Sequence, residues 1–234
     1  AVMSGRITDI AGHPSNNRII YAGTAGGGIW KSTNGGASFK SIFDDYNQSV
    51  GIIEVDPNNP DNVVWVGTGE TWVRNSVSFG DGLYKTVDGG NTWSKIGLEN
   101  SDRISGIAIN PNNSDEVYVG VLGALWGDSD DRGVYKTSDG GQTWTNILAG
   151  MKDTGCSDLF MDPKDPNTLY AAFWQVRRTA YSFSSGGPNS ALYKTTDGGK
   201  TWDKIHNGFP SGDLGRIAIG VAPSDPNILY SVIE

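Results

Sequence analysis

The chain has 234 residues, which is enough for one large domain with a substantial core. Its 33 glycines and 8 tryptophans, with only 19% charged residues, predict a turn-rich all-β protein rather than a helical one. The formal net charge of −8 argues against nonspecific nucleic-acid binding, which needs clustered cations, and no apolar run reaches the roughly 18 residues that span a bilayer.

Five apolar runs with a shared pattern recur along the chain, and a turn that contains proline follows each of them. The turns carry Pro14, Pro57, Pro111, Pro163 and Pro223. Proline has no amide proton and cannot continue a ladder, so each run is predicted to be a strand that ends there. We call these strands A and expect them at residues 6–10, 51–55, 103–109, 156–161 and 216–221.

Two further strands are predicted in each unit. Strand B is rich in β-branched and aromatic residues and nearly apolar on both faces, as expected between two neighbouring sheets. Strand C is an apolar residue, an aromatic residue and a lysine. The B runs are residues 19–22, 63–66, 117–119, 169–171 and 228–230, and the C runs are residues 29–31, 83–85, 134–136 and 192–194.

An octapeptide follows every C run. Thr-Val-Asp-Gly-Gly-Asn-Thr-Trp at residues 86–93 recurs at 137–144 and 195–202, and in weaker form at 32–39. Asp followed by Gly-Gly indicates a hairpin, because the carboxylate accepts backbone amides and the glycines supply positive φ. We therefore assign a structural role to the aspartate, with the aromatic ring packing back across its own turn. The structural residues are Asn34, Phe39, Asp88, Trp93, Asp139, Trp144, Asp197 and Trp202.

The octapeptide resembles the Asp-box, or sialidase-type repeat. Its copies begin at residues 32, 86, 137 and 195, so they are 54, 51 and 58 positions apart. One four-stranded propeller blade occupies about 40 to 55 residues. We predict an all-β partial β-propeller over residues 1–234, with blades at about 1–45, 46–99, 100–149 and 150–208, a half blade at 209–234, and further blades in a larger propeller.

The loops between strands B and C differ from blade to blade, and unequal loops on a repeated scaffold indicate a binding face. They lie at residues 68–79, 123–132 and 173–183, on the face where the A strands begin. Aromatic and guanidinium groups suit a peptide, a carboxylate or a sugar. The alternative is that the rings form small cores and the arginines pair with Glu70, Asp128, Asp130 and Asp131. The candidate ligand-binding residues are Trp72, Arg74, Phe79, Trp126, Trp174, Arg177, Arg178, Tyr181, Arg6, Arg103 and Arg216.

Asp-box repeats occur in enzymes and in receptors, so catalytic residues must be sought separately. Xyloglucan-cleaving enzymes with this repeat have the pattern Tyr-x-Arg-Thr-Asp-x-Gly-Gly with a catalytic Asp, and residues 21–28 resemble it with Ala25 in place of that Asp. The sialidase Phe-Arg-Ile-Pro signature is missing. We assign no catalytic residue, metal ligand or cofactor, and we expect Asp9, Glu54 and Asp158 to be solvated channel residues rather than a cation site.

Over nearly its whole length the chain resembles the N-terminal propeller of large secreted bacterial proteins with sortilin-like repeats, often labelled glycosyl hydrolase. The resemblance implies an extracellular or periplasmic location and a binding role. We expect a non-catalytic module for a protein or peptide ligand, without nucleic-acid partners or a membrane span. The alternatives are a carbohydrate-active propeller, glycoside hydrolase or sialidase-like, with catalytic acids outside this segment, and a structural or assembly-factor module.

Overall fold

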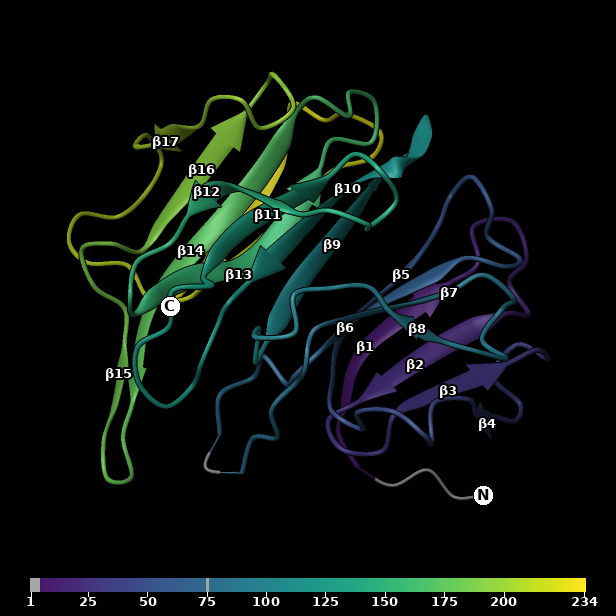
Figure 1. Cartoon of the computed structure of the whole chain (residues 1–234). Helices are drawn as coiled ribbons and strands as arrows, with labels where there is room; N and C mark the ends of the chain where they lie inside the picture. The colour runs from purple at the N-terminus through teal and green to yellow at the C-terminus, as the bar shows by residue number, and fades with distance from the viewer. Residues whose placement is uncertain (1–4, 75) are drawn as a thin grey trace.

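The computed structural model describes residues 5–74 and 76–234, and these form nineteen strands in antiparallel sheets. Four sheets have the A–B–C–D order of a propeller blade, and two strands form a half blade (Figure 1). The strands are β1 Ile7–Gly12, β2 Ile20–Thr24, β3 Ile29–Ser32 and β4 Lys40–Ser41 in blade 1; β5 Val50–Val55, β6 Val64–Thr68, β7 Leu83–Thr86 and β8 Ser94–Lys95 in blade 2; β9 Ile104–Asn110, β10 Asn113–Val121, β11 Gly133–Thr137 and β12 Thr145–Ala149 in blade 3; β13 Thr154–Met161, β14 Leu169–Arg178, β15 Phe183–Ser185, β16 Ala191–Thr195 and β17 Asp203–Ile205 in blade 4; and β18 Ile217–Val221 and β19 Leu229–Ile233 in the half blade. The predicted fold class is confirmed.

The two ends of each blade make different backbone contacts. At one end the first box glycine donates its amide to a carbonyl of the A–B turn, as Gly89 does to Asn62 at 2.9 Å and Gly198 does to Asn167 at 3.0 Å. We call this end the box face. At the other end the B–C loop pairs with the start of strand A, as Leu122 does with Arg103 at 3.0 Å. We call this end the loop face.

The box aspartate closes its own hairpin. One Asp88 oxygen accepts the amides of Asn91 and Thr92 at 2.9 Å, and the other accepts the Thr92 hydroxyl at 2.6 Å. These bonds, led by that from the Thr92 hydroxyl, hold the pKa of Asp88 well below its usual range. Gly89 and Gly90 have φ of 70° and 95°, a conformation that favours glycine. The aspartate is therefore a turn clasp.

The box tryptophan also packs against the preceding blade, a contact that the sequence did not predict. The Trp93 ring lies beside its own turn as well, with Cζ2 3.6 Å from the place of a Cβ on Gly90. The indole of Trp93 donates to the carbonyl of Ile42 in blade 1 at 3.0 Å, and that of Trp144 donates to Ile96 in blade 2 at 2.9 Å. The box therefore joins neighbouring blades as well as closing a hairpin.

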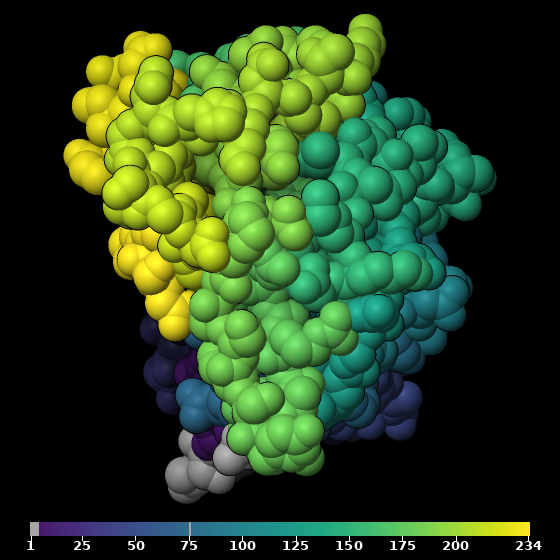
Figure 2. All heavy atoms as spheres, turned by 90° about the vertical axis from the view of Figure 1, so that its left-hand side faces the viewer, coloured from purple at the N-terminus to yellow at the C-terminus, as the bar shows by residue number. Residues whose placement is uncertain are grey.

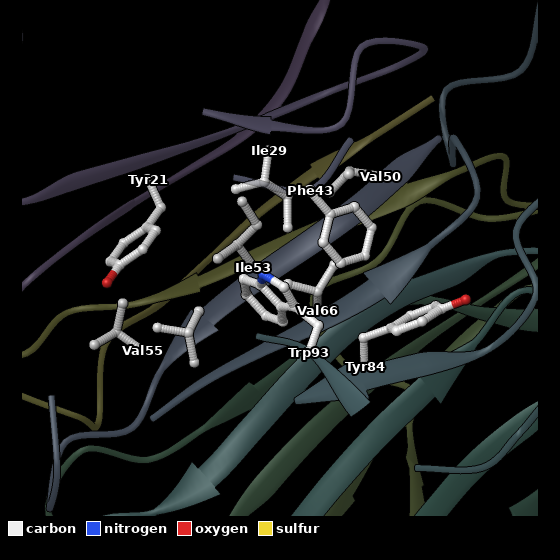
Figure 3. Close-up of a cluster of buried hydrophobic side chains, with 10 residues drawn as sticks. Tyr21, Ile29, Phe43, Val50, Ile53, Val55, Val66, Tyr84 and Trp93 are labelled. Atoms are coloured by element: carbon white, nitrogen blue, oxygen red, sulfur yellow. The ribbon is translucent and has the colours of Figure 1, made fainter. Parts of the chain in front are cut away.

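The hydrophobic core lies in layers between successive blades. In the layer between blades 1 and 2, Trp93 packs edge-on against Phe43 with ring centroids 5.2 Å apart, beside Val66 and Ile53 (Figure 3). Similar layers join blades 2 and 3, blades 3 and 4, and blade 4 and the half blade. Both faces of the B strands of blades 1 to 4 are thereby largely buried, which explains their nearly continuous apolar sequences. In contrast, β19 of the half blade leaves Tyr230 and Val232 exposed.

The lysine of strand C also bridges two blades. Lys31 donates to the carbonyl of Gly89 in the next box at 2.8 Å, and Lys85 donates to that of Gly140 at 3.3 Å. The same ammonium groups lie over rings of strand B, with Lys85 4.5 Å from the Trp65 ring. This repeated contact explains why a lysine precedes each box.

Blade 4 departs from the prediction at its B–C connection. Residues 173–183 were expected to form a loop, but β14 continues to Arg178 and pairs with β15. Alternating side chains from Phe173 to Arg178 allow one face to pack on the blade while the ladder continues. The hairpin projects below the rest of blade 4 in both views (Figures 1 and 2).

Within the described part of the chain, no helix has the length and apolar character needed to cross a membrane.

Candidate functional site

The B–C loops of blades 2, 3 and 4 meet on the loop face. Val73 of blade 2 packs against a small buried cluster of Leu122 from blade 3 and Trp174 and Val176 from blade 4. Arg177 forms an ion pair with Asp128, which joins the blade 4 hairpin to the blade 3 loop. The three unequal loops therefore form one continuous surface.

Glu70 is the buried anchor of the blade 2 loop. Its carboxylate is 1% exposed and accepts two hydrogen bonds from Arg6, at 2.9 and 2.6 Å. Its backbone amide donates to the hydroxyl of Ser49 at 3.0 Å, and the Arg74 guanidinium lies 3.7 Å from the carboxylate. The pairing of these arginines with Glu70 makes them part of the scaffold of the face, although both keep exposed surface.

Arg216 connects the half blade to the blade 2 loop. It donates to the carbonyl of Thr71 at 3.0 Å, although the two residues are 145 positions apart. Its guanidinium lies 4.4 Å from the Trp72 ring centroid and 5.3 Å from that of Trp174. Burial lowers the pKa of Arg216 from its usual value. The blade 2 loop thus reaches across from blade 2 to strand β18.

Arg103 supports the blade 3 loop from below and does not reach the surface. It is fully buried and donates to the carbonyls of Gly123 at 2.7 Å and Ala124 at 2.9 Å. Burial, with Arg132 nearby, lowers the pKa of Arg103 to about 9. Arg132, which the sequence did not single out, is also buried and donates to Ala124 at 2.7 Å. Neither guanidinium is placed to contact a ligand directly.

The exposed aromatic rings are distributed over all three loops. Tyr181 is 93% exposed and Trp72 is 55% exposed, whereas Trp174 is only 2% exposed. Trp174 packs edge-on against Phe183 and donates to the hydroxyl of Ser185 at 3.1 Å. Trp174 is thus a core residue of the hairpin. The exposed rings are Trp72, Phe79, Trp126, Tyr181 and Phe183, and Arg178 lies over the Phe183 ring.

Ala25, which takes the place of the catalytic aspartate of xyloglucan-cleaving enzymes, lies on the loop face. Ala25 follows β2, is buried, and donates its amide to the carbonyl of Arg6 at 3.1 Å. Its methyl group can neither accept nor donate a proton. Among residues 5–74 and 76–234, no group of three or more His, Cys, Asp or Glu is arranged to hold a metal ion.

The A strands of successive blades lie side by side and carry three carboxyl groups. Asp9 accepts the amide of Ile53 at 2.7 Å, and Asp158 accepts that of Ile219 at 2.9 Å, so both tie one blade to the next. Burial raises the pKa of both groups. Burial also raises the pKa of Glu54 to about 8, with contributions from Asp9 and Asp56. Glu54 is therefore mostly neutral at pH 7.

Replacing Glu54 with glutamine should stabilise the protein at alkaline pH. The folded pKa lies above the ordinary value of 4.5, so the folded state retains a proton that the unfolded state has lost. Stability of the parent protein therefore falls as pH rises from 4.5 to about 8, whereas glutamine does not titrate. We expect a gain of several kcal/mol at pH 9, at most about 5 kcal/mol, and almost none at pH 4, measured by urea unfolding. An equal gain at both pH values would contradict this prediction.

Comparison with known proteins agrees with this architecture. A probable oligoxyloglucan-reducing end-specific xyloglucanase of Neosartorya fischeri is 27% identical over 222 residues, which cover 86% of this chain and 24% of that protein. A xyloglucanase of Paenibacillus sp is 26% identical, over 85% of this chain and 20% of that protein. The chain therefore spans about a quarter of the length of the curated relatives that it matches.

The crystal structure of an ancestral GH74 enzyme has the same fold. It superimposes with a TM-score of 0.71 at 19% identity, over 97% of this chain and 29% of that one. The fold and the four boxes define the molecule as an Asp-box β-propeller segment, part of a larger propeller. The model of the Sortilin-Vps10 family (sortilin, neurotensin receptor 3) matches residues 81–225, and the chain belongs to this family.

Proposed function

We propose that the chain is a non-catalytic recognition module of a larger, secreted propeller and that its loop face binds a protein or peptide. The observation that carries this proposal is the exposure of five aromatic rings on three unequal loops, which are held by the ion pairs Arg6–Glu70 and Arg177–Asp128 and by the buried Arg103. Aromatic side chains with polar neighbours are enriched at the centres of protein interfaces. Residues that recur in every blade hold the fold together and leave these loops free to differ.

The direct contacts are assigned to the exposed groups alone. Trp72, Trp126 and Tyr181 offer open rings, and Arg74 and Arg177 offer guanidinium groups that also keep exposed surface. Arg103 and Trp174 position the loops from within. The absence of a side-chain acid at Ala25 supports a binding role, because paired-carboxylate hydrolysis needs two acids.

A second candidate is the binding of a polysaccharide. It is favoured by the similarity to two xyloglucanases over more than four fifths of the chain. Exposed tryptophan and tyrosine rings can stack on the apolar faces of sugar rings as well as on peptide side chains. In this case the catalytic acids of the complete protein lie outside this segment.

Replacing Trp72, Trp126 and Tyr181 together with alanine should reduce ligand affinity at least about tenfold, because exposed aromatic anchors contribute most of the energy of such interfaces. The complete protein would be used to select ligands from a displayed peptide library and would be assayed against a panel that includes xyloglucan. Val87→Ala, an exposed apolar change on the box face, is the matched control.

Selected peptides that bind the parent and the control but not the triple variant would support the proposal. Peptides that bind all three proteins equally would refute it. Binding of xyloglucan that is lost in the triple variant, without any selected peptide, would establish the second candidate instead.

A further inference from the structure

A cavity of about 440 Å³ lies along strand β9, between the A strands of blades 2 and 4. It extends from Ser105 and Asp158 to the turn prolines Pro111 and Pro163, which lie at the box-face end of the A strands. The loop face is at the opposite end of the blades. The cavity is therefore separate from the aromatic surface described above.

The walls of this cavity are mainly apolar. Ile52 of β5, Ile107 and Ile109 of β9 and Met161 of β13 line it. A volume of this size lies within the range of small-molecule sites. Its lining suits a hydrocarbon chain of a few carbons, because burying apolar surface is favourable and makes no demand for hydrogen bonds.

One acid on the cavity wall has no partner. Among residues 5–74 and 76–234, nothing donates a hydrogen bond or an ion pair to the Glu54 carboxyl group. Asp158, on the opposite wall, already accepts the amides of Leu159 and Ile219. The Glu54 oxygens keep accessible surface, so a group that enters the cavity can reach them. Glu54 is therefore the group available to a ligand.

The charges around Glu54 favour a cation. The charges of Asp9 in β1 and of Asp56, which follows β5, act on Glu54, and Asp158 of β13 belongs to the same cavity lining. The one polar side chain that β9 contributes to the lining is Ser105. Among the residues that the structure describes, no lysine or arginine lines the cavity, and Arg216 acts on Asp158 from outside this lining. A positive group would relieve repulsion among these acids, whereas an anion would add to it.

We propose that this channel cavity binds an alkylammonium group, with the ammonium paired to Glu54 and the carbon chain packed on the isoleucines of β5 and β9. A lysine side chain of a peptide and a free aliphatic amine share this chemistry. Asp158 supplies a second negative charge without giving up its hydrogen bonds to the backbone.

Binding of such a group must release a proton near neutral pH. Glu54 holds a proton at pH 7 because its pKa is raised to about 8, and pairing with an ammonium requires the carboxylate. Most of a proton should leave per ligand bound at pH 7. The association constant should rise about tenfold between pH 7 and pH 9, where Glu54 is ionised and the amine is still charged.

The experiment is a calorimetric titration of the complete protein with n-butylamine and with Nα-acetyl-lysine amide, in two buffers of different ionisation enthalpy. Both amines should bind and release a proton, and 1-butanol should not bind. A stronger response to one amine would show whether a free amine or a lysine side chain is the better ligand. Failure of both amines to bind, or binding without proton release, would overturn the proposal.

Glu54→Gln tests the assigned group. It should reduce amine affinity at least about tenfold at pH 9 and remove both the proton release and the pH dependence. Glu99→Gln, at an exposed glutamate, is the matched control and should change neither. Glu54→Asp keeps the charge and should restore part of the affinity. Equal binding by the parent protein and Glu54→Gln would refute the role of Glu54 and with it the proposal.

Discussion

Replacing Trp93 with alanine should lower the free energy of unfolding by about 3 to 5 kcal/mol, the usual cost of truncating a large buried aromatic side chain. The indole is 6% exposed, packs edge-on against Phe43, and donates to the carbonyl of Ile42. Alanine leaves a cavity between blades 1 and 2 and an unpaired carbonyl. Urea unfolding followed by far-ultraviolet circular dichroism is the appropriate measurement, because it does not depend on the removed fluorophore.

Two further variants separate the contributions to this loss. Trp93→Phe keeps most of the apolar packing and loses the hydrogen bond to Ile42, so we expect about 1 to 2 kcal/mol. Trp126→Ala removes a ring that is 44% exposed and should change stability by less than about 0.5 kcal/mol. A Trp93→Ala protein as stable as Trp126→Ala would show that the box tryptophan does not join the blades. If Trp93→Ala does not fold, the comparison rests on Trp93→Phe.

Replacing Arg6 with methionine should destabilise the protein by about 2 to 4 kcal/mol. The change leaves the Glu70 carboxylate, which is 1% exposed, without its two hydrogen bonds from Arg6. Arg74, at 3.7 Å, compensates only in part. The blade 2 loop should also become more sensitive to trypsin, which cleaves after Arg74. Unfolding in urea and limited proteolysis would measure the two effects.

Replacing Glu70 with glutamine should lower the free energy of unfolding by less than replacing Arg6 does. Glu70→Gln leaves the Arg6 guanidinium unpaired, but Arg6 is 38% exposed and water can solvate it. A buried charge without a partner is more costly than an exposed one. We therefore expect Arg6→Met to be more destabilising than Glu70→Gln. The opposite order would show that the arginine, not the glutamate, is the group that requires compensation.

The repeat and the blade fold were predictable because the relevant physics is local. Asp, Gly-Gly and a short hydroxyl-bearing residue close the same turn wherever they occur, as Asp88 does with Thr92. Proline ends each A strand for an equally local reason. The spacing of the boxes then fixes the length of a blade. The sequence also placed the unequal loops together on one face, because strand ends alternate in a meander.

The candidate site was predicted less well. Arg103 and Trp174 were assigned to ligand binding, but both are buried beneath the loops. An arginine near a loop gives no sign in the sequence of whether it points outward or donates to the loop carbonyls. The blade 4 hairpin was missed because its alternation continues that of β14 without a turn signal before Thr179.

The sequence by itself determined the hairpins, the strand order and the presence of Ala25 where xyloglucan-cleaving enzymes have a catalytic aspartate. Only the tertiary structure decided which groups of other blades the long side chains contact. Three features depend on groups that are distant in sequence. They are the packing of Trp93 against blade 1, the contact of Arg216 with Thr71, and the lack of a hydrogen-bond donor to Glu54. The reason is physical: a turn is closed by bonds within a few residues, whereas burial and charge pairing depend on which blades pack together.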